Sequence, residues 1–441
     1  MDLGRRPLRI AVVGAGAAGL SAAWLLSQRH TVTLYEADDR LGGHANTTDT
    51  PEGVPVDTGF IVYNEPNYPN FTALLAWLGV ESIPADMALS VSLDDGAFEY
   101  SSFGALGLFA QGRNLFSARF WGMLRDVGRF YRQGPGDLAA LEAPLTSLDA
   151  YLEQKGYCQA FRDDHLLPQA AAIWSTPLAA IREYPAAALI RFFQNHGMMS
   201  VFGRGVWRTV KGGSRSYVTA LAAAFQGQVL TGARVAGVRR DADGVEVRQA
   251  CGRIERYDHV VIAAHGDGAL ALLEDPAVEE TRLLSAFRYS RNQVVLHTDP
   301  ALMPKRKRAW TSWNHIGRRA RPDEGCVTYW MNRLQSLKSP KDLFVTLNPT
   351  RPIAPEAVIR TEAYDHPLFD AAAIAAQGEL WSLQGVRRTW FCGSYFGHGF
   401  HEDALQSGLA VAEQLGGVRR PWTVADESGR IHLGEVREIA A

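Results

Sequence analysis

The sequence predicts an α/β fold of two domains, one built on a parallel sheet and the other an α+β unit inserted into it. Residues 9–13 form a short apolar run, followed by closely spaced glycines and an alanine-rich stretch, and similar runs return at 259–264 and 389–392. Short apolar runs of this kind are typical of parallel strands that are buried on both faces. With 441 residues, 46% of them hydrophobic, the chain is long enough to bury two cores.

The first strand, the helix after it and the second strand carry a nucleotide-binding pattern. Gly14, Gly16 and Gly19 follow the strand in G-x-G-x-x-G spacing, and the second strand, 31–36, ends in Glu36. In such a Rossmann-type unit the three glycines permit, in that order, a tight turn, close approach to a pyrophosphate and close packing of helix on strand. The phosphates lie at the helix N-terminus, and the carboxylate accepts hydrogen bonds from a ribose. A carboxylate at this point disfavours NADP because it would repel a 2′-phosphate.

The stretch after Glu36, "ADDRLGGHANT", contains Arg40, Gly42, Gly43 and His44. Together with "VVGAGAAGLSAAWLL" and "VTLYE" it resembles the FAD-binding start of the amine oxidase and phytoene desaturase superfamily, where an arginine usually stands in place of His44. The resemblance implies that the double glycine runs against the ribityl and phosphates of FAD. It also implies that Arg40 helps to neutralise the pyrophosphate, the alternative being a solvated surface arginine. The FAD-binding residues expected in this segment are Gly14, Ala15, Gly16, Ala17, Ala18, Gly19, Glu36, Ala37, Arg40, Gly42, Gly43 and His44.

Two later segments complete the FAD site that the resemblance implies. In the first, 228–265, alternating strands with an Asp243–Gly244 turn predict a small antiparallel meander, and the run 259–264 returns to the parallel sheet. The resemblance places Val235 against the adenine and Ala263 beside the dinucleotide.

In the second segment, 389–415, an apolar strand runs into Gly393 and an alanine-rich helix follows. The last FAD motif of the superfamily matches Gly393, Phe400, Glu402 and Asp403. The N-terminus of a helix carries about half a positive charge, which would stabilise an anionic reduced flavin. The alternative for the two acids is ordinary charge at a helix N-terminus, with the backbone amides making the contacts.

These positions predict how the chain divides into domains. The FAD-binding domain is expected from 1–75, 205–285 and 386–420, and the substrate-binding domain from 76–204 and 286–385. We find no internal repeat and no low-complexity linker.

The stretch "VDTGFIVYN", 56–64, marks the first transition between the domains. The resemblance implies that Asp57, Thr58 and Gly59 run beside the isoalloxazine ring, and Thr58, Gly59 and Phe60 are expected to bind FAD. Phe60, Tyr63 and Asn64 are candidates for the active face of the flavin, the alternative being packing at the domain junction.

His44 is the third catalytic candidate, and three interpretations of its side chain stay open. It is a neutral hydrogen-bonding partner of the cofactor, a packing residue or a proton acceptor.

Aromatic and cysteine positions bear on the chemistry. Amine oxidases often hold the amine between aromatic side chains, and one such position matches Phe400, which lacks a polar group. A covalent flavin thioether would require a cysteine at a motif position where none is found, so the FAD is expected to be noncovalent.

No two cysteines form a CxxC pair, which argues against a zinc site or a disulfide framework and fits the reducing cytoplasm. The four are Cys158, Cys251, Cys326 and Cys392.

Residues 101–133 alternate aromatic and aliphatic side chains with five arginines and one acid, Asp126. The arginines are Arg113, Arg119, Arg125, Arg129 and Arg132. A second basic cluster, 304–321, carries two tryptophans. Such segments suit the anionic surface of a membrane, the alternative being a domain helix with one core face and one solvated basic face.

No run reaches the ~20 apolar residues of a membrane span, so peripheral binding to the inner face of the cell membrane is expected. A net charge of −2 without a recognition motif disfavours nucleic acid.

The motifs "VDTGF", "NYPNF", "VKGGSRSYV", "AAHGD" and "GHGFHEDALQSG" are similar to those of one narrower branch over nearly the whole chain. It contains bacterial flavoproteins associated with cyclopropane-synthase-like lipid methyltransferases, including the flavin-dependent desaturase of methylated fatty acyl chains in the furan fatty-acid pathway. The resemblance implies oxidation of a methyl-branched, monounsaturated acyl chain of membrane phospholipid to a conjugated diene, in functional connection with a lipid methyltransferase. An amine oxidase-type oxidase of a small molecule and a non-catalytic flavin- and lipid-binding partner of the methyltransferase stay open, as does a homodimer.

Overall fold

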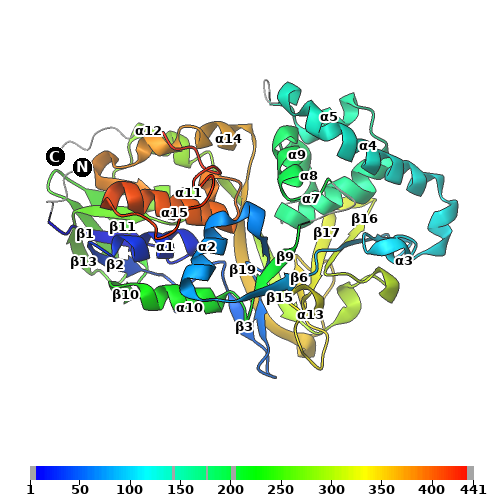
Figure 1. The fold of residues 1–441 in the computed structure, drawn as a ribbon, viewed down its shortest axis with the longest axis horizontal. Helices are drawn as coiled ribbons and strands as arrows, with labels where there is room; N and C mark the ends of the chain where they lie inside the picture. The colour runs from blue at the N-terminus through cyan, green and yellow to red at the C-terminus, as the bar shows by residue number, and fades with distance from the viewer. Residues whose placement is uncertain (1–5, 142–144, 175–176, 200–204, 435–441) are drawn as a thin grey trace.

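Residues 6–141, 145–174, 177–199 and 205–434 are described by the structure, a computed structural model. They form two bodies side by side, one around a parallel sheet and one around a mixed sheet (Figure 1). The expected fold class is therefore confirmed: an α/β protein with a parallel sheet, a β-meander and an added α+β unit.

The parallel sheet has five strands in the order β10-β2-β1-β14-β20. They are β1 Arg9–Val13, β2 Thr31–Tyr35, β10 Gln228–Leu230, β14 His259–Ile262 and β20 Thr389–Phe391. Every neighbouring pair is parallel. All residues of β1 after Arg9 are buried, as expected of a central strand covered on both faces.

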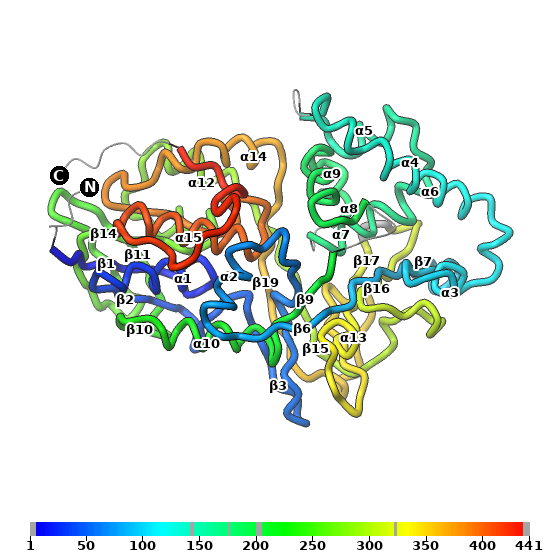
Figure 2. Tube along the Cα trace, in the orientation of Figure 1, coloured from blue at the N-terminus to red at the C-terminus, as the bar shows by residue number. Residues whose placement is uncertain are grey.

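Helices and a meander cover this sheet. The helices are α1 Ala17–Leu26, α2 Pro69–Leu78, α10 Arg215–Ala224, α11 Gly266–Leu272, α12 Val278–Leu284, α14 Ala371–Gln377 and α15 His401–Gly416. The meander strands are β11 Val235–Arg240, β12 Val245–Gln249 and β13 Ile254–Tyr257. α1 and α15 pack together although they come from opposite ends of the chain (Figure 2). Their contact is close, since a Cβ on Gly408 would lie 2.2 Å from the carbonyl oxygen of Ala18.

The mixed sheet of the second body has seven strands in the order β19-β15-β18-β17-β16-β7-β8. They are β7 Leu89–Leu93, β8 Phe98–Ser101, β15 Arg288–His297, β16 Trp313–Arg318, β17 Arg321–Trp330, β18 Phe344–Leu347 and β19 Val358–Leu368. β7 pairs in parallel with β16, so two distant parts of the chain complete one sheet. The positions of the domain boundaries stay a prediction.

Two small sheets lie between the bodies and join neighbouring segments. The first is the pair β3 Thr47–Asp49 and β4 Pro55–Asp57. In the second, the central strand β9 Trp207–Val210 pairs with β5 Tyr63–Asn64 and β6 Ser82–Ala85.

A layer of helices covers one side of the mixed sheet (Figure 1). The helices of this body are α3 Gly104–Leu108, α4 Ala118–Leu141, α5 Leu148–Gln154, α6 Gln159–Phe161, α7 Leu167–Trp174, α8 Leu178–Glu183, α9 Ala186–Asn195 and α13 Met331–Leu334. α7 packs on β16 and α8 on β17. Within the four described ranges, no helix is both long and apolar enough to cross a bilayer.

Three of the five arginines of 101–133 form ion pairs, and membrane binding by this segment stays a prediction. Arg119 forms a two-bond ion pair with the buried Asp164, with distances of 2.8 and 3.1 Å. Arg125 and Arg129 both pair with Asp126, at 3.1 and 3.7 Å.

The cluster 304–321 is likewise neutralised in part, because Lys305 pairs with Asp95 and Arg306 with Glu99. Asp164, Asp95 and Glu99 come from other segments of the chain, so the sequence around each cluster does not show these partners.

Candidate active site

A cavity of about 830 Å³ begins at the carboxyl ends of the parallel strands and continues beneath the helices of the second body. Its near end is lined by the glycine turn after β1 and by Ala263 after β14, and its far end by Trp174, Phe192 and Trp207. Ligands of open α/β sheets bind at this edge of the sheet. The cavity is therefore the candidate active site.

The glycine turn after β1 is shaped by close packing. Gly14 has a φ of +100°, and a Cβ there would lie 2.6 Å from the carbonyl oxygen of Ala263. A Cβ on Gly19 would lie 1.8 Å from the carbonyl oxygen of Gly14. No heavy atom lies within 4 Å of a Cβ built on Gly16, which faces open space. Gly14 and Gly19 thus permit packing, whereas Gly16 leaves room for a ligand.

The loop after β2 packs directly on this turn. The Gly42 N–H donates to the carbonyl oxygen of Ala15 over 2.8 Å, and a Cβ on Gly43 would lie 3.2 Å from the Cα of Gly16. The Ala15 N–H donates to the Glu36 carboxylate over 2.8 Å. Glu36, the glycine turn after β1 and the loop after β2 line the near end of the cavity. The motifs noted separately in the sequence therefore meet at one place.

The residues at the near end fit the expected FAD. Nη1 of Arg40 is buried and has no hydrogen-bond partner in the described part of the chain, so a cationic donor is available for an anionic acceptor. The open space at Gly16 lies beside the N-terminus of α1, where the helix dipole favours a phosphate. Glu36 offers carboxylate oxygens for a ribose. Arg40, Gly16 and Glu36 would hold the pyrophosphate and the adenosine ribose.

Most of the predicted cofactor-binding residues line the cavity. They are Gly14, Ala15, Gly16, Ala17, Ala18, Glu36, Ala37, Gly42, Gly43, His44, Thr58, Gly59, Phe60, Ala263, Gly393 and Phe400. Gly19, Arg40, Val235, Glu402 and Asp403 are not among the lining residues. Val235 is buried at the start of β11, where it pairs in register with Gln249.

Tyr63 and Asn64, two of the three catalytic candidates, lie away from the cavity wall, which corrects the expectation that they face the reacting centre. The Tyr63 hydroxyl donates to Oγ of Ser82 over 2.8 Å. Oδ1 of Asn64 accepts from the backbone N–H of Asn67 over 3.1 Å and caps a short helical turn. Both side chains are buried, so they serve packing at the junction between the two bodies.

The carboxylates of Glu402 and Asp403 are also turned away from the cavity. Glu402 accepts hydrogen bonds from the backbone N–H groups of Asn70 and Phe71, at 3.0 and 2.9 Å. Asp403 pairs with Arg430 at 2.7 Å and caps the first turn of α15 by accepting from the Phe400 N–H. Of the two readings left open by the sequence, the structure favours the one in which these acids organise the helix N-terminus.

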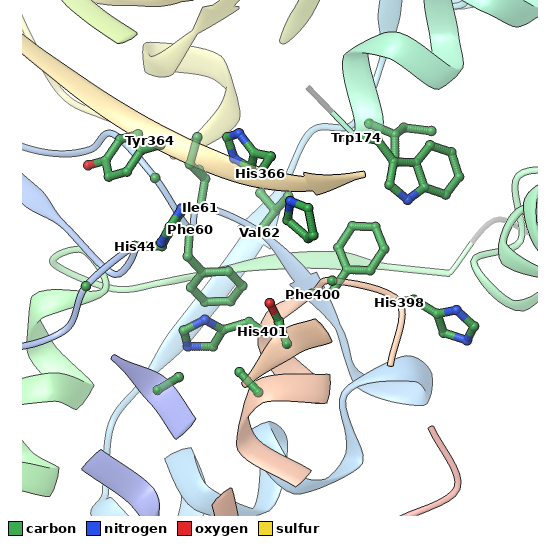
Figure 3. Close-up of a pocket in the computed structure, with 18 of the residues that line it drawn as sticks. His44, Phe60, Ile61, Val62, Trp174, Tyr364, His366, His398, Phe400 and His401 are labelled. Carbon is green, nitrogen blue, oxygen red and sulfur yellow. The ribbon is translucent and has the colours of Figure 1, made fainter. Parts of the chain in front are cut away.

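Imidazoles gather in the middle of the cavity, and Figure 3 shows His44, Tyr364 and His366 on one side of it. The His44 ring centroid lies 4.9 Å from that of Tyr364 and 5.6 Å from that of His366. Burial, followed by the neighbouring imidazoles of His366 and His265, lowers the pKa of His44 well below its usual value. Burial also lowers the pKa of His366 to about 4. Both imidazoles are therefore neutral at neutral pH.

Hydrogen bonds distinguish the two imidazoles. The Asn292 amide donates to the Ser290 carbonyl and accepts at Oδ1 from Asn348, which fixes its orientation. Its Nδ2 therefore donates to Nδ1 of His366 over 2.9 Å, which leaves the proton of His366 on Nε2. His44 has no comparable side-chain partner within the described ranges, and its neutral ring offers one nitrogen as an acceptor.

A third imidazole, His401, is the first residue of α15. Its ring stacks on Phe60 with centroids 3.8 Å apart, and its Nε2 is 2.7 Å from the hydroxyl of Tyr217 (Figure 3). Burial lowers its pKa to about 3, so this ring is also neutral. The stack of Phe60 on His401 joins the start of α15 to the loop that contains Phe60.

The far half of the cavity is largely apolar, with Gln169, His196 and His398 as polar exceptions. Phe400 stacks on Phe192 at a centroid distance of 4.9 Å, next to Trp174. Among the lining residues that the structure describes, none is a lysine or an arginine. The apolar wall consists of Ile61, Val62, Met87, Leu89, Ile173, Trp174, Phe192, Met198, Trp207, Val294, Trp313, Tyr329, Leu347 and Phe400.

His366, Tyr364 and His401 were not found by sequence reasoning. His401 lies next to Phe400 inside a quoted motif, so the motif itself carried a signal. Tyr364 and His366 lie on β19, where alternate residues share one face, but nothing in the local sequence shows which face meets the cavity.

Known proteins resemble this chain at two levels. In sequence, 55 residues are 54% identical to an L-amino-acid oxidase of Bungarus fasciatus, covering 12% of this chain and 11% of that protein. The match thus spans about a tenth of the length of that curated relative.

In structure, a variant of putrescine oxidase superposes with a TM-score of 0.67 at 15% identity, covering 93% of this chain and 99% of that one. A CLA-producing fatty acid isomerase from P. acnes superposes with a TM-score of 0.64 at 16% identity, covering 92% and 98%. Identities this low show a shared fold.

The family itself is shown by a match over most of the chain. The family model for flavin containing amine oxidoreductase matches residues 17–416, from the first residue of α1 to the last residue of α15. The matched range begins directly after Gly16 of the glycine turn and includes Phe400 and the whole of α15. The chain therefore belongs to the family of flavin-containing amine oxidoreductases.

Proposed function

We propose that the protein is an FAD-dependent oxidoreductase that desaturates a methyl-branched acyl chain of membrane phospholipid. The observation that carries the proposal is one continuous cavity with a nucleotide-binding turn at one end and an apolar wall at the other. Burial of an acyl chain gains about 0.8 kcal/mol per CH₂ group. The carboxylate of an amino acid would meet no lysine or arginine on the described wall.

The proposed reaction converts a methyl-branched, monounsaturated chain into a conjugated diene by loss of a hydride and a proton from adjacent carbons. FAD, when bound, supplies the two-electron acceptor. The apolar walls around Phe192 and Trp174 hold the chain and exclude water. His44 accepts the proton at its unprotonated ring nitrogen, because burial keeps this imidazole neutral.

Noncovalent FAD is part of the proposal. Cys392 follows β20 directly, is fully buried and does not line the cavity. Burial raises the pKa of its thiol, which disfavours the reactive thiolate. Acid precipitation of the purified protein should therefore release the flavin into the supernatant, and a yellow pellet would contradict noncovalent binding.

The proposed place of action is the inner face of the cell membrane, where the substrate lies. In this proposal, the methyl branch is added to the unsaturated chain by methyl transfer onto the lipid. A lipid methyltransferase therefore acts before this enzyme in the proposed sequence of reactions.

Oxidation of a small amine is the second candidate, favoured by the family to which the chain belongs. A cationic amine would gain from a carboxylate in the far half of the cavity. The acids that line the cavity are Glu36, Asp38, Asp267 and Asp365, and none of them belongs to the apolar wall.

The product tests the proposal. Purified protein is incubated in air with phospholipid that carries methyl-branched, monounsaturated chains, and the chains are then analysed by mass spectrometry. We expect a product two hydrogens lighter with the ultraviolet absorbance of a conjugated diene, and none from unbranched chains. If FAD binds but neither lipid changes, the non-catalytic alternative replaces the proposed desaturase.

A further inference from the structure

One short stretch of the chain, around α3, carries several exposed apolar side chains. Figure 1 shows α3 at the outer end of the second body. Leu106 and Phe116 are 81% and 91% exposed, close to the limit for a side chain on a folded surface. Large apolar side chains that gather on a surface mark a site of contact with a protein or a membrane. We call this stretch the entry surface; it consists of Phe103, Leu106, Leu115, Phe116 and Trp121.

Cations without an ion pair border the entry surface. Arg113 is exposed within the turn η2 Gly112–Phe116, between α3 and α4. Arg308 and Lys307 are exposed on the turn η5 Lys307–Ala309, which packs against α3. No ion pair with these three residues is formed in the described ranges, whereas Arg119 and Arg125 nearby are paired. The net charge next to the apolar side chains is therefore positive.

The cavity reaches the protein surface beside this stretch. Ser102, which directly precedes Phe103, lines the cavity and is exposed. Leu89, whose N–H donates to Oγ of Ser102 over 3.0 Å, lines the apolar half. Tyr131 on α4 also lines the cavity. The cavity that contains Trp174 thus has lining residues directly beside the entry surface.

We propose that the entry surface docks on the anionic headgroup layer of a membrane and that an acyl chain enters the cavity beside Ser102. The second half of this proposal rests on the proposed function. Exposed Phe, Leu and Trp side chains insert at the boundary between headgroups and acyl chains, and cations at the rim gain from anionic lipid. A partner protein would also cover apolar side chains, but only a bilayer both covers them and supplies the chain that the cavity accommodates.

Vesicle binding of the FAD-loaded protein tests the docking. The vesicles contain phosphatidylcholine alone or with phosphatidylglycerol, and the bound fraction is measured by flotation. We expect binding to the anionic vesicles, weaker binding at high salt, and binding about tenfold or more weaker for the double variant L106S/F116S. The matched control I254S/V278S removes two exposed apolar side chains of the first body, 55% and 82% exposed, and should bind like the wild type.

Two further measurements separate the possible outcomes. If L106S/F116S floats like the wild type, or if the wild type does not float, the docking is refuted. If the wild type is a dimer in sedimentation velocity that L106S/F116S dissociates, while neither floats, the entry surface is an interface between copies instead. Flavin reduction by detergent-dispersed substrate should be equal in L106S/F116S and wild type. Flotation without any such reduction would refute the proposed function and leave the docking intact.

Discussion

At the residue scale, His44 is the residue that departs from the superfamily pattern, and the structure shows the surroundings of its side chain. An imidazole stands where an arginine is usual, and burial keeps it neutral beside Tyr364 and His366. A guanidinium would remain charged in this position. A neutral ring with one free nitrogen suits a cavity that an apolar chain enters.

His44→Gln should retain FAD and slow flavin reduction by about 10²–10⁴, since a side-chain amide is neutral and polar like the buried imidazole but cannot accept a proton. Single-turnover stopped-flow absorbance measures the rate. The matched control is His398→Gln, because His398 lines the same cavity on the far side of Phe400 from His44 (Figure 3). Equal rates of flavin reduction in both variants would show that the His44 side chain serves packing only.

Glu36 should govern cofactor binding at the other end of the cavity. Glu36→Arg removes the carboxylate that accepts from Ala15 N–H and that would accept from the ribose. We expect most FAD to be lost during purification, measured as the ratio of flavin to protein absorbance. Full occupancy in the variant would show that the ribose is held elsewhere.

At the element scale, the start of α15 depends on charges supplied by other segments. Arg430 pairs with the fully buried Asp403. Arg430→Met leaves that carboxylate unpaired and should lower the free energy of unfolding by about 3–5 kcal/mol. Urea denaturation measures it, with Arg419→Met, an exposed ion-pair residue, as a control expected to change stability by no more than about 1 kcal/mol. Loss of FAD at unchanged stability would mean that Asp403 acts on the cofactor.

Part of this structure could be predicted from the sequence alone, and part could not. The unit of β1, α1 and β2 was predictable because its determinants lie within a few residues, as in the contact between Gly19 and Gly14. The partners of Asp403 and Arg119 are Arg430 and Asp164, which only the folded chain brings near. Tyr63 likewise packs on a strand that follows much later, so local patterns misplaced it.

At the scale of the whole molecule, buried histidines predict loss of stability in acid. Burial lowers the pKa of His297, His315 and His366 to about 4 and that of His401 to about 3. Their usual value is 6.5, so the unfolded chain binds protons first, and stability present above pH 6.5 is lost as the pH falls toward 4. Each ring contributes a loss of about 2 kcal/mol at pH 5.

Two buried acids oppose this trend. Burial raises the pKa of Asp57 to about 6 and also raises the pKa of Glu402, so the folded state gains from their protonation as the pH falls. Four imidazoles outweigh two carboxyls. The urea midpoint of the FAD-loaded protein should therefore fall steadily between pH 6.5 and 4.5, and a constant midpoint over this range would contradict the burial of neutral histidines.

At the scale of the two bodies, a single cavity extends from the nucleotide-binding turn to the apolar wall. The proposed chemistry depends on this continuity. Anaerobic mixing tests it most directly, with the flavin absorbance band followed in single-turnover experiments. Methyl-branched, monounsaturated phospholipid should bleach the flavin, while unbranched phospholipid, putrescine and L-amino acids should not. Bleaching by an amine that is faster than bleaching by any lipid would contradict the desaturase and establish the amine oxidase alternative.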